Sequence, residues 1–334
     1  MKPKLFSSAG VAASDAPAHR CSCRAFGGRW IVAFALSALS SAHAFAADRI
    51  NGQVTAAGGL VAGSTVTLWA ASADAPRQLA QTRTGPDGRF ALSGDGKGAI
   101  LYLVAKGGRP AANRVVVGDN PALALLTVLG SKPPAKVTIN EMTTLASVWT
   151  HAQFLDGTAI KGPALSLSIA AGNVPNFVDL GTGGWGEAIQ GPLNSSQTPT
   201  MANFATLADV LAGCATRAAN DACGKLFAAA TPPTGAAPTD MLTAAEAIAR
   251  YPWYKPERLF ALLDQFYPMP AGKNLRAVPF MPYLGFAPSA WVLPLRFDGG
   301  GYVAGGKGMF DSKGNFWISD NFTVGWQGLD PPAS

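Results

Sequence analysis

Hydrophobic and polar residues follow two different periods along this chain. In residues 64–70, the apolar side chains Val66, Leu68 and Ala70 alternate with other residues, which predicts a β-strand with one buried face. Further short strands are expected at residues 50–55, 79–84, 89–92, 100–106, 115–117 and 123–129. Short strands separated by Gly- and Pro-containing turns at this spacing predict an antiparallel β-sandwich over residues 48–130.

The pattern becomes helical in residues 137–272. Asn140 can cap a helix with Met142, Leu145, Val148, Trp149 and Ala152 on one face. Thr200 opens a helix that directs Phe204, Leu207, Val210 and Leu211 inward. Thr239 or Asp240 caps a helix over 241–250, and Pro256 suits the first turn of another. Residues 181–199 are expected to form a long irregular loop. The segment as a whole is predicted to be a mainly α-helical domain.

The last segment, residues 275–334, contains a hairpin pattern. Residues 310–321 read as a strand, a tight turn and a second strand, which is typical of part of one β-propeller blade. A propeller needs roughly 4–8 blades to close, so this segment predicts an incomplete propeller of one blade. The predicted fold class is therefore multidomain: a sandwich, a helical region and a partial blade.

The hairpin also carries closely spaced oxygen ligands at Asp311, Asn315, Asp320 and Asn321. Such residues can bind calcium, but Asp, Asn and Gly are also the ordinary formers of tight turns. The regular array of a calcium-binding loop is missing, so the turn-forming role is favoured and no metal ligand is assigned.

Residues 1–47 have the order of a signal peptide. A basic segment (1–29) precedes an apolar run (30–39), and a small-residue segment (40–47) contains an A-x-A pattern that ends at Ala46. The apolar run is shorter than the roughly 20 residues of a membrane-spanning helix. A buried core helix is the alternative. We expect cleavage between Ala46 and Ala47, a periplasmic or secreted product, and no transmembrane anchor in the mature chain.

The leader also accounts for most of the net charge. The whole chain carries +6, and the leader contributes five basic residues and one acidic residue to that total. The mature chain is therefore nearly neutral, without the basic character of a nucleic-acid-binding protein.

After cleavage, the sequence keeps few reactive side chains: Cys214, Cys223 and His151. In an exported protein, the two cysteines predict a disulfide, with two free buried thiols as the alternative. His151 lies in a helical pattern without a nucleophile elbow, so a structural role is favoured over a catalytic one. No catalytic, cofactor-binding or metal-binding residue is assigned.

Several aromatic residues could serve as a binding surface. Trp291, Trp317 and Trp326 are the candidates for an aromatic face that stacks on a ligand such as a glycan. The alternative is that these side chains belong to the core, which is the commoner use of aromatic residues.

The first segment resembles a known family. Residues 50–55, the strand at 63–69 and the hairpin Thr84-Gly85-Pro86-Asp87-Gly88-Arg89-Phe90 look like the carboxypeptidase regulatory-like (transthyretin-like) β-sandwich. The resemblance covers about residues 48–106. It implies a sandwich module used as a spacer or binding unit, and it implies no peptidase activity, because the zinc ligands of a carboxypeptidase are missing.

The later segments have their own resemblances. Residues 139–144, 207–214, 223–227 and 238–240 are similar to the helical insert of exported bacterial proteins of unknown function that also carry NHL-type repeats. Residues 306–321 look like the opening blade of an NHL-type or virginiamycin-lyase-like propeller. Neither resemblance supplies a catalytic residue.

Together these features favour a non-enzymatic, exported modular protein with a binding or scaffolding role at the cell envelope. Its partner would be an envelope protein or a glycan. The alternative is that the chain is the N-terminal fragment of a propeller enzyme, lyase-like or lactonase-like, whose catalytic blades lie elsewhere.

Overall fold

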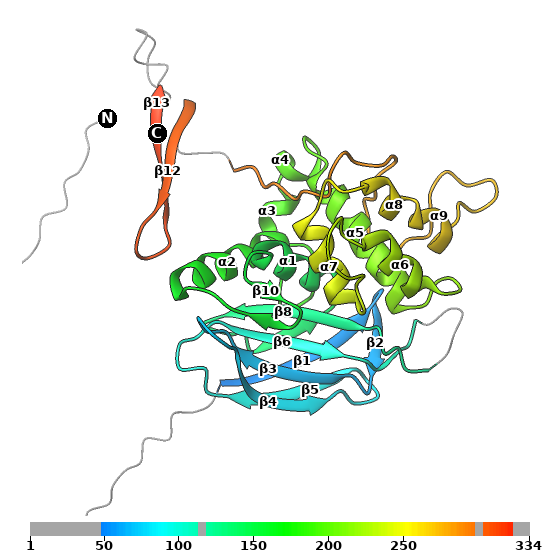
Figure 1. The fold of residues 1–334 in the computed structure, drawn as a ribbon, viewed down its shortest axis with the longest axis horizontal. Coiled ribbons are helices and arrows are strands. Elements are labelled where there is room, and N and C mark those ends of the chain that lie inside the picture. Colours follow the sequence, from blue (N-terminus) through cyan, green and yellow to red (C-terminus); the bar gives the residue numbers. More distant parts are fainter. Residues whose placement is uncertain (1–47, 113–117, 298–302, 323–334) are drawn as a thin grey trace, which may run out of the picture. The chain divides into compact units, whose positions relative to one another are not determined.

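The computed structural model describes residues 48–112, 118–297 and 303–322, and the folded body contains two β-sheets and a layer of helices (Figure 1). The predicted signal segment with Ala46 and Ala47, the strand expected at 115–117, and Trp326 lie outside the described residues.

The first sheet has the order β5-β1-β2-β7, with β9 paired to β1. Its strands are β1 (Asp48–Ala56), β2 (Gly59–Ala62), β5 (Arg89–Gly94), β7 (Arg109–Pro110) and β9 (Lys136–Ile139). The second sheet has the order β4-β3-β6-β8 and is antiparallel throughout. Its strands are β3 (Thr65–Ala70), β4 (Arg77–Arg83), β6 (Leu101–Lys106) and β8 (Ala124–Gly130).

Alternation along the strands builds the core between the two sheets. In β3, Val66, Leu68 and Ala70 are buried, and in β5 Phe90 and Leu92 are buried, as their spacing predicts. The predicted turn before β5 is also present, and Gly88 has a φ of 69°, which favours glycine. The strands expected at 50–55, 79–84, 100–106 and 123–129 correspond to β1, β4, β6 and β8.

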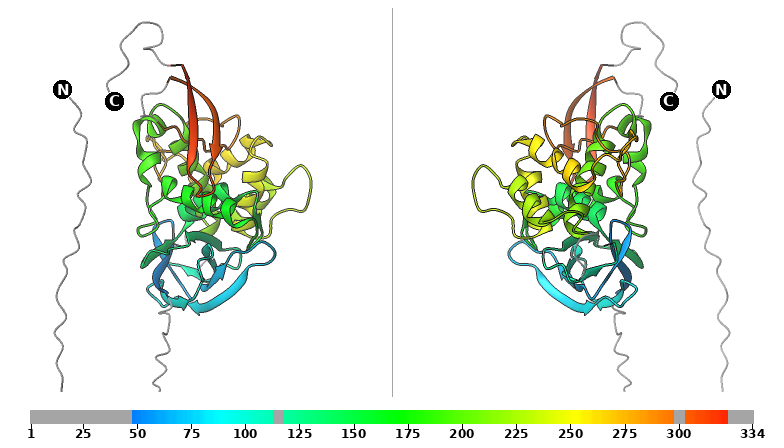
Figure 2. Two further views of the ribbon diagram at one scale, coloured as in Figure 1. Left: turned by 90° about the vertical axis from the view of Figure 1, so that its left-hand side faces the viewer. Right: turned by 90° about the vertical axis from the view of Figure 1, so that its right-hand side faces the viewer.

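Strands β6 and β8 are almost entirely buried. The helical layer lies on one side of the two sheets (Figure 2), and it packs against β8. The helices are α1 (Glu141–His151), α2 (Ala164–Phe177), α3 (Glu187–Gln190), α4 (Pro192–Ser195), α5 (Thr200–Ala215), α6 (Ala222–Ala230), α7 (Met241–Arg250), α8 (Pro256–Phe260) and α9 (Leu262–Phe266). A small hairpin, β10 (Leu155–Asp156) and β11 (Ala159–Ile160), follows α1. One continuous set of buried side chains runs through both sheets and the helices.

Two helix starts follow directly from the sequence. Asn140 accepts a hydrogen bond from the backbone N–H of Thr143 and caps α1, and Asp240 does the same with Thr243 at α7. Pro256 begins α8, as predicted. The two polar caps set the starts of α1 and α7, which both contact β8.

Helix α1 also satisfies the free edge of the second sheet. The backbone N–H groups of Leu126 and Val128 in β8 donate to the hydroxyls of Thr144 (3.0 Å) and Ser147 (2.9 Å). Strand β8 is last in the order of its sheet, and no other strand of the described residues pairs with its outer edge. The hydroxyls of α1 therefore supply acceptors that a neighbouring strand would otherwise provide.

Some elements differ from the sequence-based expectations. Residues 136–139, expected at the start of the helical segment, form β9 and pair in parallel with β1. The first sheet is therefore mixed, although an antiparallel sheet was expected. The loop expected at 181–199 contains the short helices α3 and α4. The stretch at 256–266 is divided into α8 and α9.

The C-terminal hairpin is present. Strands β12 (Val303–Phe310) and β13 (Phe316–Phe322) pair with each other, and within the described residues they pair with no other strand. The described sheets close neither a barrel nor a propeller. In the described part of the chain, no helix has the length and hydrophobicity needed to cross a bilayer.

Two helical glycines provide a test of the packing. A Cβ at Gly213 in α5 would lie 2.1 Å from the buried ring of Phe266, whereas a Cβ at exposed Gly172 in α2 would meet nothing within 4 Å. We expect Gly213→Ala to destabilise the fold by about 1–3 kcal/mol through overpacking. Gly172→Ala should stabilise it by up to about 1 kcal/mol through helix propensity. Urea unfolding measures both, and equal effects of the two changes would contradict the close packing of α5.

Candidate functional site

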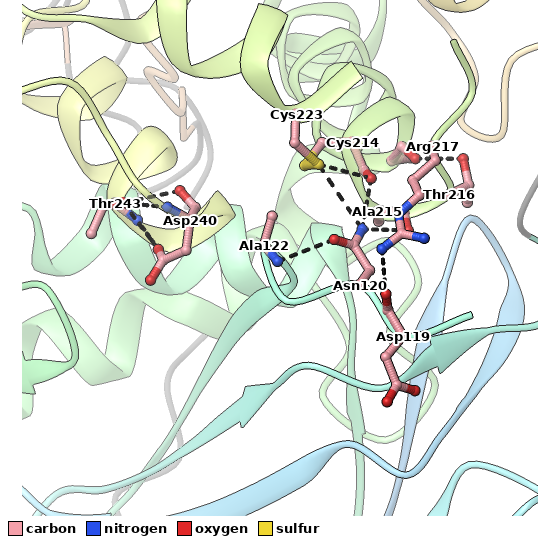
Figure 3. Close-up of a disulfide and its surroundings, with 11 residues drawn as sticks. Asp119, Asn120, Ala122, Cys214, Ala215, Thr216, Arg217, Cys223, Asp240 and Thr243 are labelled. Atoms are coloured by element: carbon pink, nitrogen blue, oxygen red, sulfur yellow. Dashed lines mark hydrogen bonds between the residues drawn. A yellow bond between two sulfur atoms is a disulfide. The ribbon is translucent and has the colours of Figure 1, made fainter. Parts of the chain in front are cut away.

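Helix α5 carries the most structured polar site of the described chain. A disulfide joins Cys214, near the helix end, to Cys223 in α6, with an S–S distance of 2.02 Å (Figure 3). The predicted bridge is therefore present, and the alternative of two free thiols is not what the structure shows. The bridge closes the turn between α5 and α6.

A loop from the sandwich region completes the end of α5. The buried Asn120 side chain donates to the carbonyls of Cys214 (2.9 Å) and Ala215 (3.0 Å) and accepts from the backbone N–H of Ala122 (3.1 Å) (Figure 3). The last carbonyls of a helix have no partner within the helix, so an amide from elsewhere in the chain satisfies them here. Disulfide and amide together fix the C-terminal end of α5.

A second set of polar side chains of α5 binds an irregular segment, residues 276–297, which we call the strap. The backbone N–H of Phe280 donates to the Asp209 carboxylate (2.9 Å), and that of Leu284 donates to the Thr206 hydroxyl (2.8 Å). Both helix residues are fully buried. Side chains of α5 therefore bind the main chain of the strap.

The same relation continues toward the start of α5. The Asn203 amide donates to the carbonyl of Val292 (3.2 Å), and the Thr200 hydroxyl donates to the carbonyl of Pro294 (2.6 Å). The four helix residues are three positions apart, so they form one row on the helix. The strap runs along this row in the direction opposite to the helix.

Asn194 in α4 extends the row by one step. Its side-chain amide donates to the carbonyl of Arg296 (2.9 Å), and its carbonyl oxygen accepts from the backbone N–H of the same residue (2.7 Å). This paired contact satisfies both main-chain groups of one strap residue. We call Asn194, Thr200, Asn203, Thr206 and Asp209 the polar row.

The row places a carboxyl group in an apolar environment. Burial raises the pKa of Asp209 to about 8, although the hydrogen bond from Phe280 N–H opposes the shift and the nearby Glu141 adds to it. Glu141, at the start of α1, accepts from the backbone N–H of Ala57 (2.9 Å), and burial raises its pKa to about 7. Within residues 48–112, 118–297 and 303–322, each carboxyl keeps one oxygen without a hydrogen-bond partner. Both groups link a helix to a distant segment of the chain.

His151 has a structural position. It is buried at the end of α1, where Nδ1 lies 3.0 Å from the carbonyl oxygen of Ser147 and 2.9 Å from the Thr150 hydroxyl. Burial lowers the pKa of His151 to about 4, so the ring is neutral at ordinary pH. No group of three His, Cys, Asp or Glu side chains in the described residues is placed to hold a metal ion.

The proposed aromatic face needs a correction at Trp291. Its side chain is only 1% exposed, and its ring N–H donates to the carbonyl of Pro256 (3.2 Å). Burial in the core removes this residue from any binding surface. Trp317, by contrast, is 67% exposed on β13, and Trp326 lies outside the described residues.

The possible calcium ligands of the hairpin are part of a turn. The Asp311 carboxylate accepts hydrogen bonds from Lys313 N–H, Asn315 N–H, the Asn315 amide and the Trp317 ring N–H. These hydrogen bonds, led by that from Trp317, lower the pKa of Asp311. The carboxylate therefore orders the β12–β13 turn, and the Asp320 and Asn321 side chains lie outside the description.

An open groove of about 750 Å³ lies between the end of β8, in the second sheet, and helix α3. Its lining includes Lys132, Asp179, Trp185, Glu187 and Gln190. The Asp179 carboxylate is bonded to the N–H and hydroxyl of Thr182, and the Gln190 amide donates to the carbonyl of Gly186. Much of the polar capacity of this groove is therefore used by the fold itself.

Sequence reasoning did not find the polar row. Thr200, Asn203, Thr206 and Asp209 recur every third residue in an otherwise apolar helix, and this spacing was a usable signal. The strap itself has no periodicity from which its contact with α5 could be inferred.

Comparison with known proteins gives no family for this chain. No family model and no curated protein matches the sequence. Among solved structures, a 9R-lipoxygenase from Cyanothece PCC8801 has a TM-score of 0.20 and 15% identity over 28% of this chain. The match spans 16% of the lipoxygenase chain, and at this level of similarity it carries no argument.

The disulfide predicts a measurable loss on reduction. Closing a short loop restricts the unfolded chain, so breaking the Cys214–Cys223 bond should lower the free energy of unfolding by about 2–3 kcal/mol. Urea unfolding with and without dithiothreitol measures this difference. The double variant Cys214→Ala/Cys223→Ala should show no response to reductant, and a wild-type protein equally insensitive would contradict the stabilising role.

The buried carboxyl of Asp209 predicts a pH dependence. Its folded-state pKa lies above the unfolded value, so its stabilisation is complete below about pH 4 and is lost as the pH rises through about 8. His151 has the opposite sign, but its contribution changes only below about pH 6.5. The free energy of unfolding should therefore fall between pH 6.5 and pH 9. Glu141 contributes to this fall, because burial raises its pKa to about 7.

Asp209→Asn should fall less steeply over this range, because the amide oxygen still accepts from Phe280 and no longer titrates. Asp74→Asn, at an exposed site, should keep the wild-type slope. Parallel curves for wild type and Asp209→Asn would show that Asp209 does not titrate in the folded protein.

Proposed function

We propose that this chain is an exported, non-enzymatic modular protein with a binding or scaffolding role at the cell envelope. In this proposal, the sheets and helices of residues 48–297 form a structural support, and the C-terminal hairpin β12–β13 contacts the partner. The exposed apolar surface of that hairpin is the observation that carries the proposal.

The hairpin exposes side chains that are usually buried. Met309 is 74% exposed and lies opposite Trp317, and Phe316 is 57% exposed and lies opposite Phe310. The rings of Phe310 and Phe316 are 5.0 Å apart, and the position of Gly308 leaves room for Phe316 on the same face. Apolar side chains gathered in this way usually mark an interaction surface.

The strand pairing supports the same interpretation. A hairpin of two strands is marginally stable in water by itself, and its outer edges can pair with another strand. Within the described residues, β12 and β13 have no other strand beside them. An envelope protein that adds a strand, or a glycan that stacks on Trp317, fits this surface.

The proposed compartment is supported by the disulfide. Disulfides persist in oxidising compartments, which agrees with the signal segment expected at residues 1–47. The two-sheet arrangement is compatible with the carboxypeptidase regulatory-like module proposed for residues 48–106, whose role would be that of a spacer or support.

A second candidate function follows from the hairpin itself. Propeller blades contain four strands, and β12 with β13 could form half of one blade of an NHL-type or virginiamycin-lyase-like propeller. The chain would then be the N-terminal part of a lyase-like or lactonase-like enzyme. The DNA that follows the Ser334 codon distinguishes the two: further blade-encoding sequence supports this candidate, and unrelated sequence supports the first.

The binding role can be tested with the hairpin aromatics. Wild-type protein should co-sediment with isolated cell envelopes, and Phe316→Ser/Trp317→Ser should not, because the change removes the exposed apolar surface while the body stays folded. Trp253→Ser removes another exposed tryptophan, at a site away from the hairpin in sequence, and should keep binding.

Mass analysis of the recovered protein tests the compartment. A chain that begins near Ala47 with an oxidised Cys214–Cys223 pair is expected. A cytosolic product with an intact N-terminus and reduced thiols would contradict the proposal, as would turnover of a lyase or lactonase substrate by the purified protein.

A further inference from the structure

The strap is bound chiefly through its main chain. All hydrogen bonds between the polar row and the strap join a row side chain to a strap N–H or carbonyl group. Recognition of this kind is typical of peptide-binding sites, where main-chain hydrogen bonds give affinity and side-chain pockets give selectivity.

The side-chain pockets are also present. Trp291, Leu284 and Leu293 of the strap are buried. The main chain of Trp291 is held on both sides, since its N–H donates to the carbonyl of Pro252 (2.8 Å) and its carbonyl accepts from the ring N–H of Trp149 (3.1 Å). This residue is therefore the principal anchor of the strap.

The composition of the strap suits a bound peptide. Prolines at 279, 282, 288 and 294 fix one backbone dihedral each and so limit the conformations of the free segment, which follows an irregular, bent path in the fold. A segment restricted in this way loses less conformational entropy when it binds.

The polar row has more hydrogen-bonding capacity than the strap uses. Asn203 Oδ1 and Asp209 Oδ2 are buried and have no hydrogen-bond partner among the residues that the structure describes. Phe280, which donates to Asp209, has Pro279 before it, and that proline has no N–H to offer. A peptide that offers an N–H group to Asn203 Oδ1 could satisfy more of the row than the strap does.

We propose that the polar row and the Trp291 pocket form a binding site for an irregular peptide segment, which this chain fills with its own strap as a separable ligand. The ligand class is a proline-containing peptide without regular secondary structure that carries a tryptophan anchor and a nearby leucine. The site is distinct from the hairpin surface, so this inference does not rest on the proposed compartment or envelope role.

The connection to α9 allows a direct test. Residues 268–275 join α9 to the strap and are largely exposed, and Gly272 has a φ of 71° in a turn. A protease recognition sequence inserted after Gly272 lets the full chain fold before it is cut. A fluorescent peptide with the sequence of residues 276–297 is then added, and its anisotropy is followed at increasing urea below the unfolding transition.

The two pieces of the cut protein should elute together, and the labelled peptide should enter cut protein but not uncut protein. In cut protein, Asn194→Ala should release the peptide roughly tenfold faster, because the paired contact to Arg296 is lost. Asn173→Ala should leave release unchanged, since this exposed amide bonds only within α2.

A labelled peptide with Trp291→Ala should bind at least roughly tenfold more weakly, through loss of the anchor. Two results would overturn the proposal. One is that the labelled peptide fails to enter cut protein at every urea concentration below the transition. The other is that cutting abolishes cooperative unfolding and added peptide does not restore it. Either result would make the strap an inseparable part of the core.

Discussion

The rest of this structure depends on side chains of helices that satisfy the main chain of extended segments. Thr144 and Ser147 of α1 accept from Leu126 and Val128 in the last strand of the second sheet. A buried N–H group without a hydrogen-bond partner lowers the stability of the folded state by about as much as a lost hydrogen bond. These hydroxyls therefore allow the helical layer to cover the edge of the sheet. The helices and the sheets consequently share one buried core, and α5 repeats the arrangement with the strap.

This arrangement explains why polar side chains are buried within the hydrophobic core. The hydroxyls and amides of α1 and α5 are buried because they replace the partners that water or a strand would provide. Glu141 acts in the same way on the turn between β1 and β2, through the N–H of Ala57. The carboxyls are the costly members of this set, since burial raises the pKa of both Glu141 and Asp209.

Local signals in the sequence predicted local structure well. The alternation in β3, the caps at Asn140 and Asp240, and the Cys214–Cys223 pair all appear as expected, because each depends on residues close in sequence. The burial of Trp291 was not predictable, since its pocket comes from segments far away along the chain. The parallel pairing of β9 with β1 was missed for the same reason, because no local pattern specifies a distant parallel partner.

That parallel pairing has a consequence for how the protein is made. Asn51 lies opposite Lys136, so the first strand gains this neighbour only after a long intervening stretch has been synthesised. During synthesis the chain emerges from the ribosome with its N-terminal end first. One edge of β1 therefore stays without its β9 partner until residues 136–139 have emerged. A nascent chain stalled before residue 136 would keep this edge open, and stalled chains of increasing length would show when the first sheet becomes protected from proteolysis.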